Sequence, residues 1–142
     1  QVVQGECEFV SLEDEVAFIT SYVELERERV GYRCDIDFKF SSDKENSYEI
    51  APMLLIAFIE NAFKHGTATV EKCFVKIYIL VESNQLRFVV ENSIPSKKKE
   101  ISSNNIGLQN TKDRLDILYP NRHSLDIKKT ENLYLVNLTF DI

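Results

Sequence analysis

The sequence has 142 residues, of which 44% are hydrophobic and 11% aromatic, and its formal net charge is −6. A chain of this length and composition is expected to fold as one domain around its own hydrophobic core. The acidic balance argues against direct nucleic-acid binding, because such a surface needs clustered Lys and Arg. No apolar run approaches the roughly 18 residues of a membrane-spanning helix, and no signal peptide is visible.

The three cysteines, Cys7, Cys34 and Cys73, lack the spacing and the nearby histidines of a zinc site. They do not indicate a disulfide framework either, so we expect a reducing, cytosolic setting. The chain begins with Gln1 rather than Met, which leads us to expect a fragment of a larger protein.

The first predicted element is a helix over about residues 12–30. Ser11 and Asp14 form a capping box at its start, and an apolar residue then recurs at helical spacing from Leu12 to Val23. A strand follows over 34–40, where apolar and charged residues alternate. One face of this strand is therefore expected to contact water.

A polar loop leads to the second helix. Pro52 is expected to open it, because proline is tolerated in a first helical turn, and Gly66 is expected to end it. The apolar run "APMLLIAFI" gives way to the polar ending "ENAFKHG". Either the buried helix simply reaches water and stops at a glycine, or these polar groups have a further role.

Two strand patterns, "CFVKIYILV" and "QLRFVVEN", are expected to form a hairpin around Ser83 and Asn84. The polar stretch 93–105 predicts a mobile loop. A third helix should then stop at Pro120, and a second hairpin should turn near 130–132. The third helix is expected to bury one stripe, formed by Leu108, Thr111, Leu115 and Leu118.

This order of elements predicts an α+β fold. We expect a two-layer α/β sandwich, with a mixed, mostly antiparallel sheet and about three helices on one face.

The polar end of the second helix has two interpretations. Asn61, Lys64 and His65 stand at i, i+3 and i+4 and share one face with Ala57. The Asn61 oxygen suits Mg²⁺ and Lys64 suits phosphate, so this face could hold a ligand. Alternatively, Glu60 and Lys64 form an ordinary pair, and His65 only complements the helix dipole.

Gly107 lies where the polar loop meets the third helix. Free N–H groups at a helix start, beside a glycine that permits close approach, can bind an anion. The alternative is an ordinary glycine at a loop–helix junction.

Taken together, these segments resemble a known family. "PMLLIAFIENAFKHG" resembles the N box, and "NIGLQNTKDRLDILYP" the second glycine box, of the GHKL (Bergerat-fold) ATPase domain of sensor histidine kinases. "ENAFKHG" and the helix "VSLEDEVAFITSYVELERERV" look most like the LytS-type branch. The resemblance covers roughly Val10 to Ile142 and implies a linker over residues 1–10 and an ATP-binding catalytic domain over 11–142.

The resemblance assigns roles to the N box. Asn61 matches the ligand of the Mg²⁺ that bridges the ATP phosphates, and Lys64 and His65 match the basic end near those phosphates. Glu60 matches the acidic residue before the metal ligand, and we hypothesise that it acts as a base toward the acceptor histidine.

It also assigns the nucleotide end of the site. Gly107 and Leu108 match the turn whose backbone amides face the triphosphate, and Ser93 to Asn105 corresponds to a lid over ATP. Two positions depart from the family pattern. Asn92 stands where an adenine-binding Asp is expected, with no glycine after it, and Asn105 replaces the first glycine of the second box. An Asn oxygen still accepts a hydrogen bond, so weaker nucleotide binding is expected.

The family implies a two-component kinase. The γ-phosphoryl of ATP would pass to a histidine on a separate dimerisation domain of the same protein, and then to a response regulator, for which the LytTR type is one candidate. Neither His65 nor His123 suits that acceptor. The intact protein is expected to be a homodimer, attached to a membrane only through upstream segments, with this domain in the cytoplasm.

Two alternatives remain open. A module with this fold could have lost catalysis and serve as a nucleotide sensor or scaffold, since Asn92 and the missing glycines weaken the adenine end. A serine kinase that acts on an anti-sigma-factor antagonist shares the fold, but the "ENAFKHG" pattern fits it less well.

Overall fold

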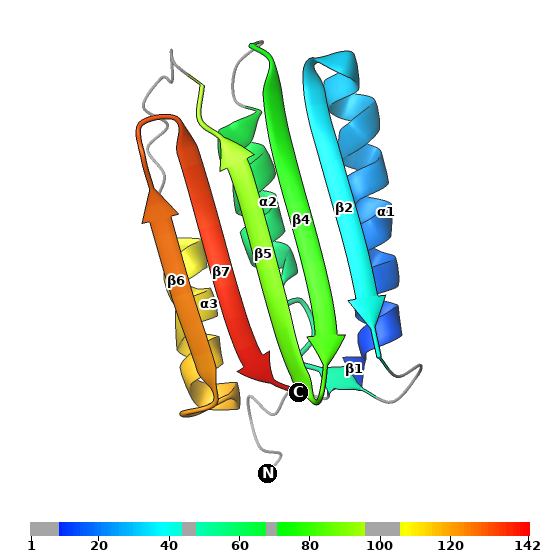
Figure 1. Ribbon diagram of the computed structural model, residues 1–142, viewed down its shortest axis with the longest axis vertical. Coiled ribbons are helices and arrows are strands. Elements are labelled where there is room, and N and C mark those ends of the chain that lie inside the picture. The colour runs from blue at the N-terminus through cyan, green and yellow to red at the C-terminus, as the bar shows by residue number, and fades with distance from the viewer. Residues whose placement is uncertain (1–8, 44–47, 68–70, 96–105) are drawn as a thin grey trace.

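The computed structural model describes residues 9–43, 48–67, 71–95 and 106–142. Its elements form two layers, a sheet in front and helices behind it (Figure 1). In chain order they are β1 (Val10–Ser11), α1 (Leu12–Val30), a 3₁₀ turn (Gly31–Arg33), β2 (Cys34–Ser42), β3 (Glu49–Ile50), α2 (Ile56–Gly66), β4 (Cys73–Glu82), β5 (Gln85–Ser93), α3 (Ile106–Leu118), β6 (His123–Lys129) and β7 (Leu133–Asp141).

The main sheet has five strands in the order β2-β4-β5-β7-β6. Only the pair formed by β2 and β4 is parallel, and the other three pairs are antiparallel. The β4–β5 hairpin turns at Ser83 and Asn84, whose φ angles of 53° and 63° match the twist of a tight two-residue turn. The sheet is therefore mixed and mostly antiparallel, as the sequence predicts.

The three helices cover one face of this sheet (Figure 1). The strands alternate accordingly: Val75, Ile77 and Ile79 of β4 are buried, whereas Lys76 and Leu80 on the opposite face are exposed. The α+β sandwich with three helices on one face is thus confirmed. None of the described helices combines the length and the apolarity that crossing a bilayer requires.

Helix α1 forms as its sequence predicts. The Ser11 hydroxyl accepts a hydrogen bond from the Asp14 backbone N–H at 3.1 Å, which caps the helix start. Leu12, Ile19 and Val23 are completely buried. The predicted bounds of 12–30 agree with the observed ones.

Helix α3 and the last hairpin also agree with the sequence pattern. Thr111 and Leu115 are buried on the face of α3 that meets the core, and Leu108 packs against the core from the same side. Strands β6 and β7 pair on either side of a turn at 130–132.

The second helix begins later than predicted. Residues 52–55 form turns, and α2 starts at Ile56. Met53 has a φ of 62°, in the left-handed region, so Pro52 cannot belong to a continuous first helical turn. Gly66 is the last residue of the helix, but its φ is not positive, so it does not end the helix as a left-handed cap.

Two further expectations need correction. The sequence does not predict the small sheet of β1 and β3, in which Val10 pairs with Ile50. The predicted loop begins too early, because Ser93 still belongs to β5 and Ile94 and Pro95 are buried. The backbone N–H of Ile94 donates to the Asn132 carbonyl at 3.0 Å, which fixes this segment to the β6–β7 turn.

Candidate functional site

The polar face of α2 points away from the sheet. Phe58, Ile59 and Phe63 are buried beneath the strands, whereas Asn61 and His65 are half-buried and Lys64 is exposed. Because 3.6 residues make one turn, the side that carries Asn61 and Lys64 lies opposite the buried side. The side of α2 that carries Asn61 and Lys64 is therefore turned away from the core of the sheet.

Glu60 is exposed and faces α1 rather than the sheet. The Tyr22 ring of α1 packs edge-on against Phe63, with the ring centroids 5.8 Å apart. Burial, together with the negative charges of Glu26 and Glu60, raises the pKa of Tyr22 to about 12. Glu60 thus lies on the α1 side of the polar face.

Gly66 brings the end of α2 against the end of β5. A Cβ atom on Gly66 would lie 3.0 Å from the Asn92 Cβ and 3.3 Å from its Nδ2. Such distances are tighter than nine in ten real Cβ contacts, so a larger residue at position 66 would require Asn92 to move by a few tenths of an ångström. Gly66, the last residue of "ENAFKHG", therefore lies directly next to Asn92, the residue that differs from the family pattern.

Asn92 is completely buried, and only one end of its side-chain amide has a hydrogen-bond partner among the described residues. It lies on the helix-covered face of β5, and its Nδ2 donates to the Ser93 carbonyl at 2.9 Å. Its Oδ1 has no hydrogen-bond partner among the described residues. An unsatisfied buried acceptor costs about 1–3 kcal/mol, and native proteins keep few of them. The hydrogen bond to Ser93 fixes which end of the amide remains available: it is the oxygen, which accepts hydrogen bonds.

The start of α3 completes the arrangement. Helix α3 packs beside α2, and Gly107 is exposed in its first turn. The Gly107 carbonyl accepts a hydrogen bond from the Thr111 hydroxyl at 3.0 Å, which supports this turn. Leu108 is half-buried and packs against the core, so it anchors the helix start. The first N–H groups of an α-helix have no partner within the helix and can meet an anion.

Other predicted parts of the site lie outside the described residues. These are Asn105 and the segment 96–105, which contains most of the predicted lid and Lys97 to Lys99. Residues 1–8 of the predicted linker are outside as well, while the Phe9 ring contacts Tyr119 at 6.1 Å between centroids. Within the described ranges, no group of three His, Cys, Asp or Glu side chains could hold a metal ion.

The sequence does not predict a polar clamp at the turn before α2. The Glu15 carboxylate of α1 accepts a hydrogen bond from the Met53 N–H at 3.0 Å, and Arg114 of α3 donates to the Pro52 carbonyl at 2.9 Å. Glu15 is only 4% exposed. Burial raises the pKa of Glu15, and the Met53 hydrogen bond and the Arg114 charge oppose this effect. The clamp ties α1 and α3 to the turn that leads into α2.

A signal for this clamp exists in the sequence. Glu15 lies three residues after Leu12 and four before Ile19, on the apolar stripe of α1. A carboxylate at such a position needs a buried donor, because burying an unpaired charge is costly. What the sequence cannot reveal is the donor, since Met53 contributes its backbone rather than its side chain.

Comparison with protein-family models and with curated proteins finds no match. Solved structures do match. The catalytic domain of the histidine kinase ThkA, in a nucleotide-free form, superposes with a TM-score of 0.63 at 18% identity, over 96% of this chain and 97% of that one. The histidine kinase AdeS of Acinetobacter baumannii gives a TM-score of 0.61 at 13% identity, over 98% and 68%.

ThkA also matches in a complex with the response regulator protein TrrA, with a TM-score of 0.60 at 20% identity, over 95% of this chain and 42% of that one. These identities are low, and the likeness is one of architecture. The chain therefore has the fold of histidine kinase catalytic domains.

Proposed function

We propose that this chain is the ATP-binding catalytic domain of a two-component sensor histidine kinase of the LytS type. The observation that carries the proposal is the Asn92 oxygen, which is buried, unpartnered among the described residues and adjacent to Gly66 at the polar end of α2. A buried acceptor fixed in this way suits a donor on a bound ligand. The exocyclic amine of adenine is such a donor, and the fold is that of histidine kinase catalytic domains.

The polar face of α2 would bind the phosphate end. The Asn61 side-chain oxygen is a hard, neutral ligand of the kind that Mg²⁺ accepts alongside phosphates and water. Lys64, exposed on the same face, would supply a positive charge toward phosphate, with His65 beside it. The bound Mg²⁺ would neutralise charge on the phosphates.

The start of α3 would orient the triphosphate. Gly107 and Leu108 present backbone N–H groups in the first turn, where the helix dipole favours an anion. Phosphoryl transfer of this type depends on positioning and charge neutralisation. The domain would thus hold ATP for a histidine on the dimerisation domain, and the phosphate would continue to a response regulator.

The remaining parts of the proposal concern the intact protein. Glu60 is the candidate base toward the acceptor histidine, because it is exposed beside Asn61. Replacing Glu60 by Gln should slow phosphoryl transfer and leave nucleotide affinity nearly unchanged, and an unchanged transfer rate would remove this role. The intact protein would be a homodimer with this domain in the cytoplasm, and its regulator could be of the LytTR type.

The second candidate is a nucleotide sensor or scaffold without catalysis. The neutral amide of Asn92 favours it, because an Asn accepts a weaker hydrogen bond than a charged carboxylate does. Such a module would bind the nucleotide weakly and without a requirement for Mg²⁺.

Calorimetric titration with a non-hydrolysable ATP analogue, with and without Mg²⁺, distinguishes the two. We expect Mg²⁺-dependent binding that Asn61→Ala weakens at least tenfold, which is about 1.4 kcal/mol. The matched control is Asn137→Ala. Asn137 is exposed on the open face of the sheet, which is the face that no helix covers, and this variant should bind the nucleotide as the wild type does. A folded protein that shows no Mg²⁺-dependent binding at millimolar nucleotide would exclude the catalytic proposal.

A further inference from the structure

Two buried cysteines face each other across the parallel strand pair. Cys34 is the first residue of β2 and Cys73 the first of β4, and the two are direct register partners. Both thiols are free, and the residues are only 7% and 8% exposed. Neighbouring strands lie about 4.8 Å apart, within the Cα separation of roughly 4.4–6.8 Å that a disulfide spans. Residues paired in register point to the same face of a sheet, so the two side chains lie together.

The two thiols are also in contact. Burial raises the pKa of the Cys34 thiol, and a hydrogen bond between its side chain and that of Cys73 raises it further. Because the thiolate is the reactive form, this raised pKa makes the oxidation of Cys34 slow at neutral pH and faster as the pH rises. The Arg33 guanidinium donates to the Cys73 sulfur at 3.7 Å, and the Cys73 sulfur lies 3.6 Å from the Arg33 carbonyl. Arg33 thus holds the Cys73 sulfur in place next to Cys34.

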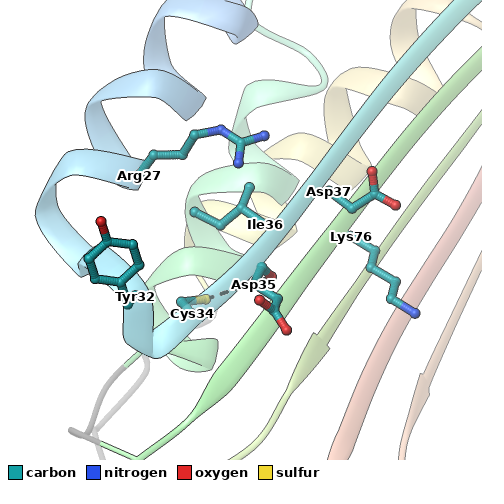
Figure 2. A pocket seen from close by; sticks show the side chains of 8 residues that line it. Arg27, Tyr32, Cys34, Asp35, Ile36, Asp37 and Lys76 are labelled. Carbon is teal, nitrogen blue, oxygen red and sulfur yellow. Dashed lines mark hydrogen bonds between the residues drawn. The ribbon is translucent and has the colours of Figure 1, made fainter.

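A small oxidant can reach this pair from the surface. Cys34 lines a hollow of about 330 Å³ at the end of α1, together with Arg27, Tyr32 and Asp35 (Figure 2). Tyr32, one of the residues that line it, is fully exposed to solvent. Although both sulfurs are largely buried, one of them is therefore next to solvent-accessible space.

We propose that Cys34 and Cys73 form a thiol–disulfide modification site, which a peroxide oxidises to an intramolecular disulfide between β2 and β4. Hydrogen peroxide first oxidises the sulfur of Cys34, the cysteine that lines the hollow, to a sulfenic acid and is itself reduced to water. The Cys73 sulfur then attacks the sulfenic sulfur of Cys34, the S–O bond breaks, and the hydroxide that leaves combines with the thiol proton of Cys73 as a second water. In total, two thiols and one peroxide give one disulfide and two waters. This site is independent of the proposed nucleotide chemistry.

The test uses the Cys7→Ser protein, which leaves only Cys34 and Cys73. The folded, reduced protein is treated with hydrogen peroxide and then analysed by intact mass and by thiol titration in denaturant. We expect a loss of mass equal to two hydrogen atoms, a fall in titratable thiols from two to none, and a proteolytic fragment that joins the two cysteines. Dithiothreitol should restore both thiols.

Two controls separate this result from general oxidation. Cys34→Ser and Cys73→Ser, each in the Cys7→Ser background, should form no intramolecular cross-link. The same peroxide treatment in denaturing urea should form the cross-link at least tenfold more slowly, because the register no longer holds the sulfurs together. If the folded protein keeps both thiols, or loses them only to intermolecular disulfides or to sulfinic acid, the proposal is wrong.

Discussion

At the scale of single residues, the packing of Gly66 against Asn92 limits which side chains either position can hold. The glycine allows α2 to approach β5, and the asparagine occupies the space that a larger residue at position 66 would need. The hydrogen bond from Nδ2 to Ser93 then leaves the Asn92 oxygen as the free end of the amide. One small residue and one amide orientation thus define the buried end of the candidate site.

Replacing Gly66 by Ala should destabilise the domain. The added methyl group would lie 3.0 Å from the Asn92 Cβ, so α2 or β5 must shift, at a cost of about 1–3 kcal/mol in the free energy of unfolding. Urea unfolding followed by circular dichroism measures this cost. Gly107→Ala is the matched control, since a Cβ there meets nothing within 4 Å and Ala favours the helix. Equal effects of the two changes would contradict the packing argument.

Asn92 should select nucleotides that carry an exocyclic amine. We expect ATP to bind about tenfold to a hundredfold more tightly than the purine nucleotide that lacks the 6-amino group, because the latter leaves the buried oxygen unpaired. Competition calorimetry gives the two affinities. In Asn92→Ala the preference should disappear. A wild-type protein that binds both nucleotides equally would show that the Asn92 oxygen does not meet the base.

At the scale of elements, the turn before α2 decides where that helix begins. Glu15 and Arg114 hold residues 52 and 53 through backbone groups, and Met53 adopts a left-handed conformation there. The apolar run "APMLLIAFI" predicts one continuous helix, because the spacing of apolar residues shows which side chains are buried and not which groups bind the backbone. For the same reason, the two-residue strands β1 and β3 leave no pattern to recognise.

Glu15→Ala should cost about 1–3 kcal/mol of stability, because the Met53 N–H loses its acceptor. Glu15→Gln keeps an oxygen for that hydrogen bond and should cost less. The pKa of Glu15 is raised above its ordinary value of 4.5, so the folded protein binds this proton more tightly than the unfolded chain does. The stability that comes from this tighter proton binding is therefore present below pH 4.5 and is lost as the pH rises through the raised pKa, whereas the hydrogen bond from Met53 is a separate contribution.

Urea unfolding of the wild type and of Glu15→Gln across this pH range tests the argument. The stability of the wild type relative to the Gln variant should fall as the pH rises above 4.5. A constant difference between the two proteins would mean that Glu15 does not titrate differently in the folded state.

At the scale of the whole molecule, the order of strands is what the sequence predicts least. Alternation identifies β2 and β4 as strands, but it cannot show that they are parallel neighbours separated in sequence by α2. The facing of Cys34 and Cys73 follows only from that pairing, and so does their proposed oxidation. The polar residues of α2 and α3 were recognisable because each lies in a short local motif, whereas the contact between Gly66 and Asn92 joins two motifs through the fold.

The central claim is that a nucleotide binds between α2, α3 and the end of β5. The most direct test is a two-dimensional ¹H–¹⁵N NMR spectrum of the domain, recorded during titration with a non-hydrolysable ATP analogue and Mg²⁺. We predict shifts of the backbone signals of residues 61–66 and 107–111, and of the Asn92 side-chain amide, while signals from the open face, such as Lys76 and Asn137, remain unchanged. No shift at millimolar nucleotide, or shifts centred on the open face of the sheet, would contradict the claim.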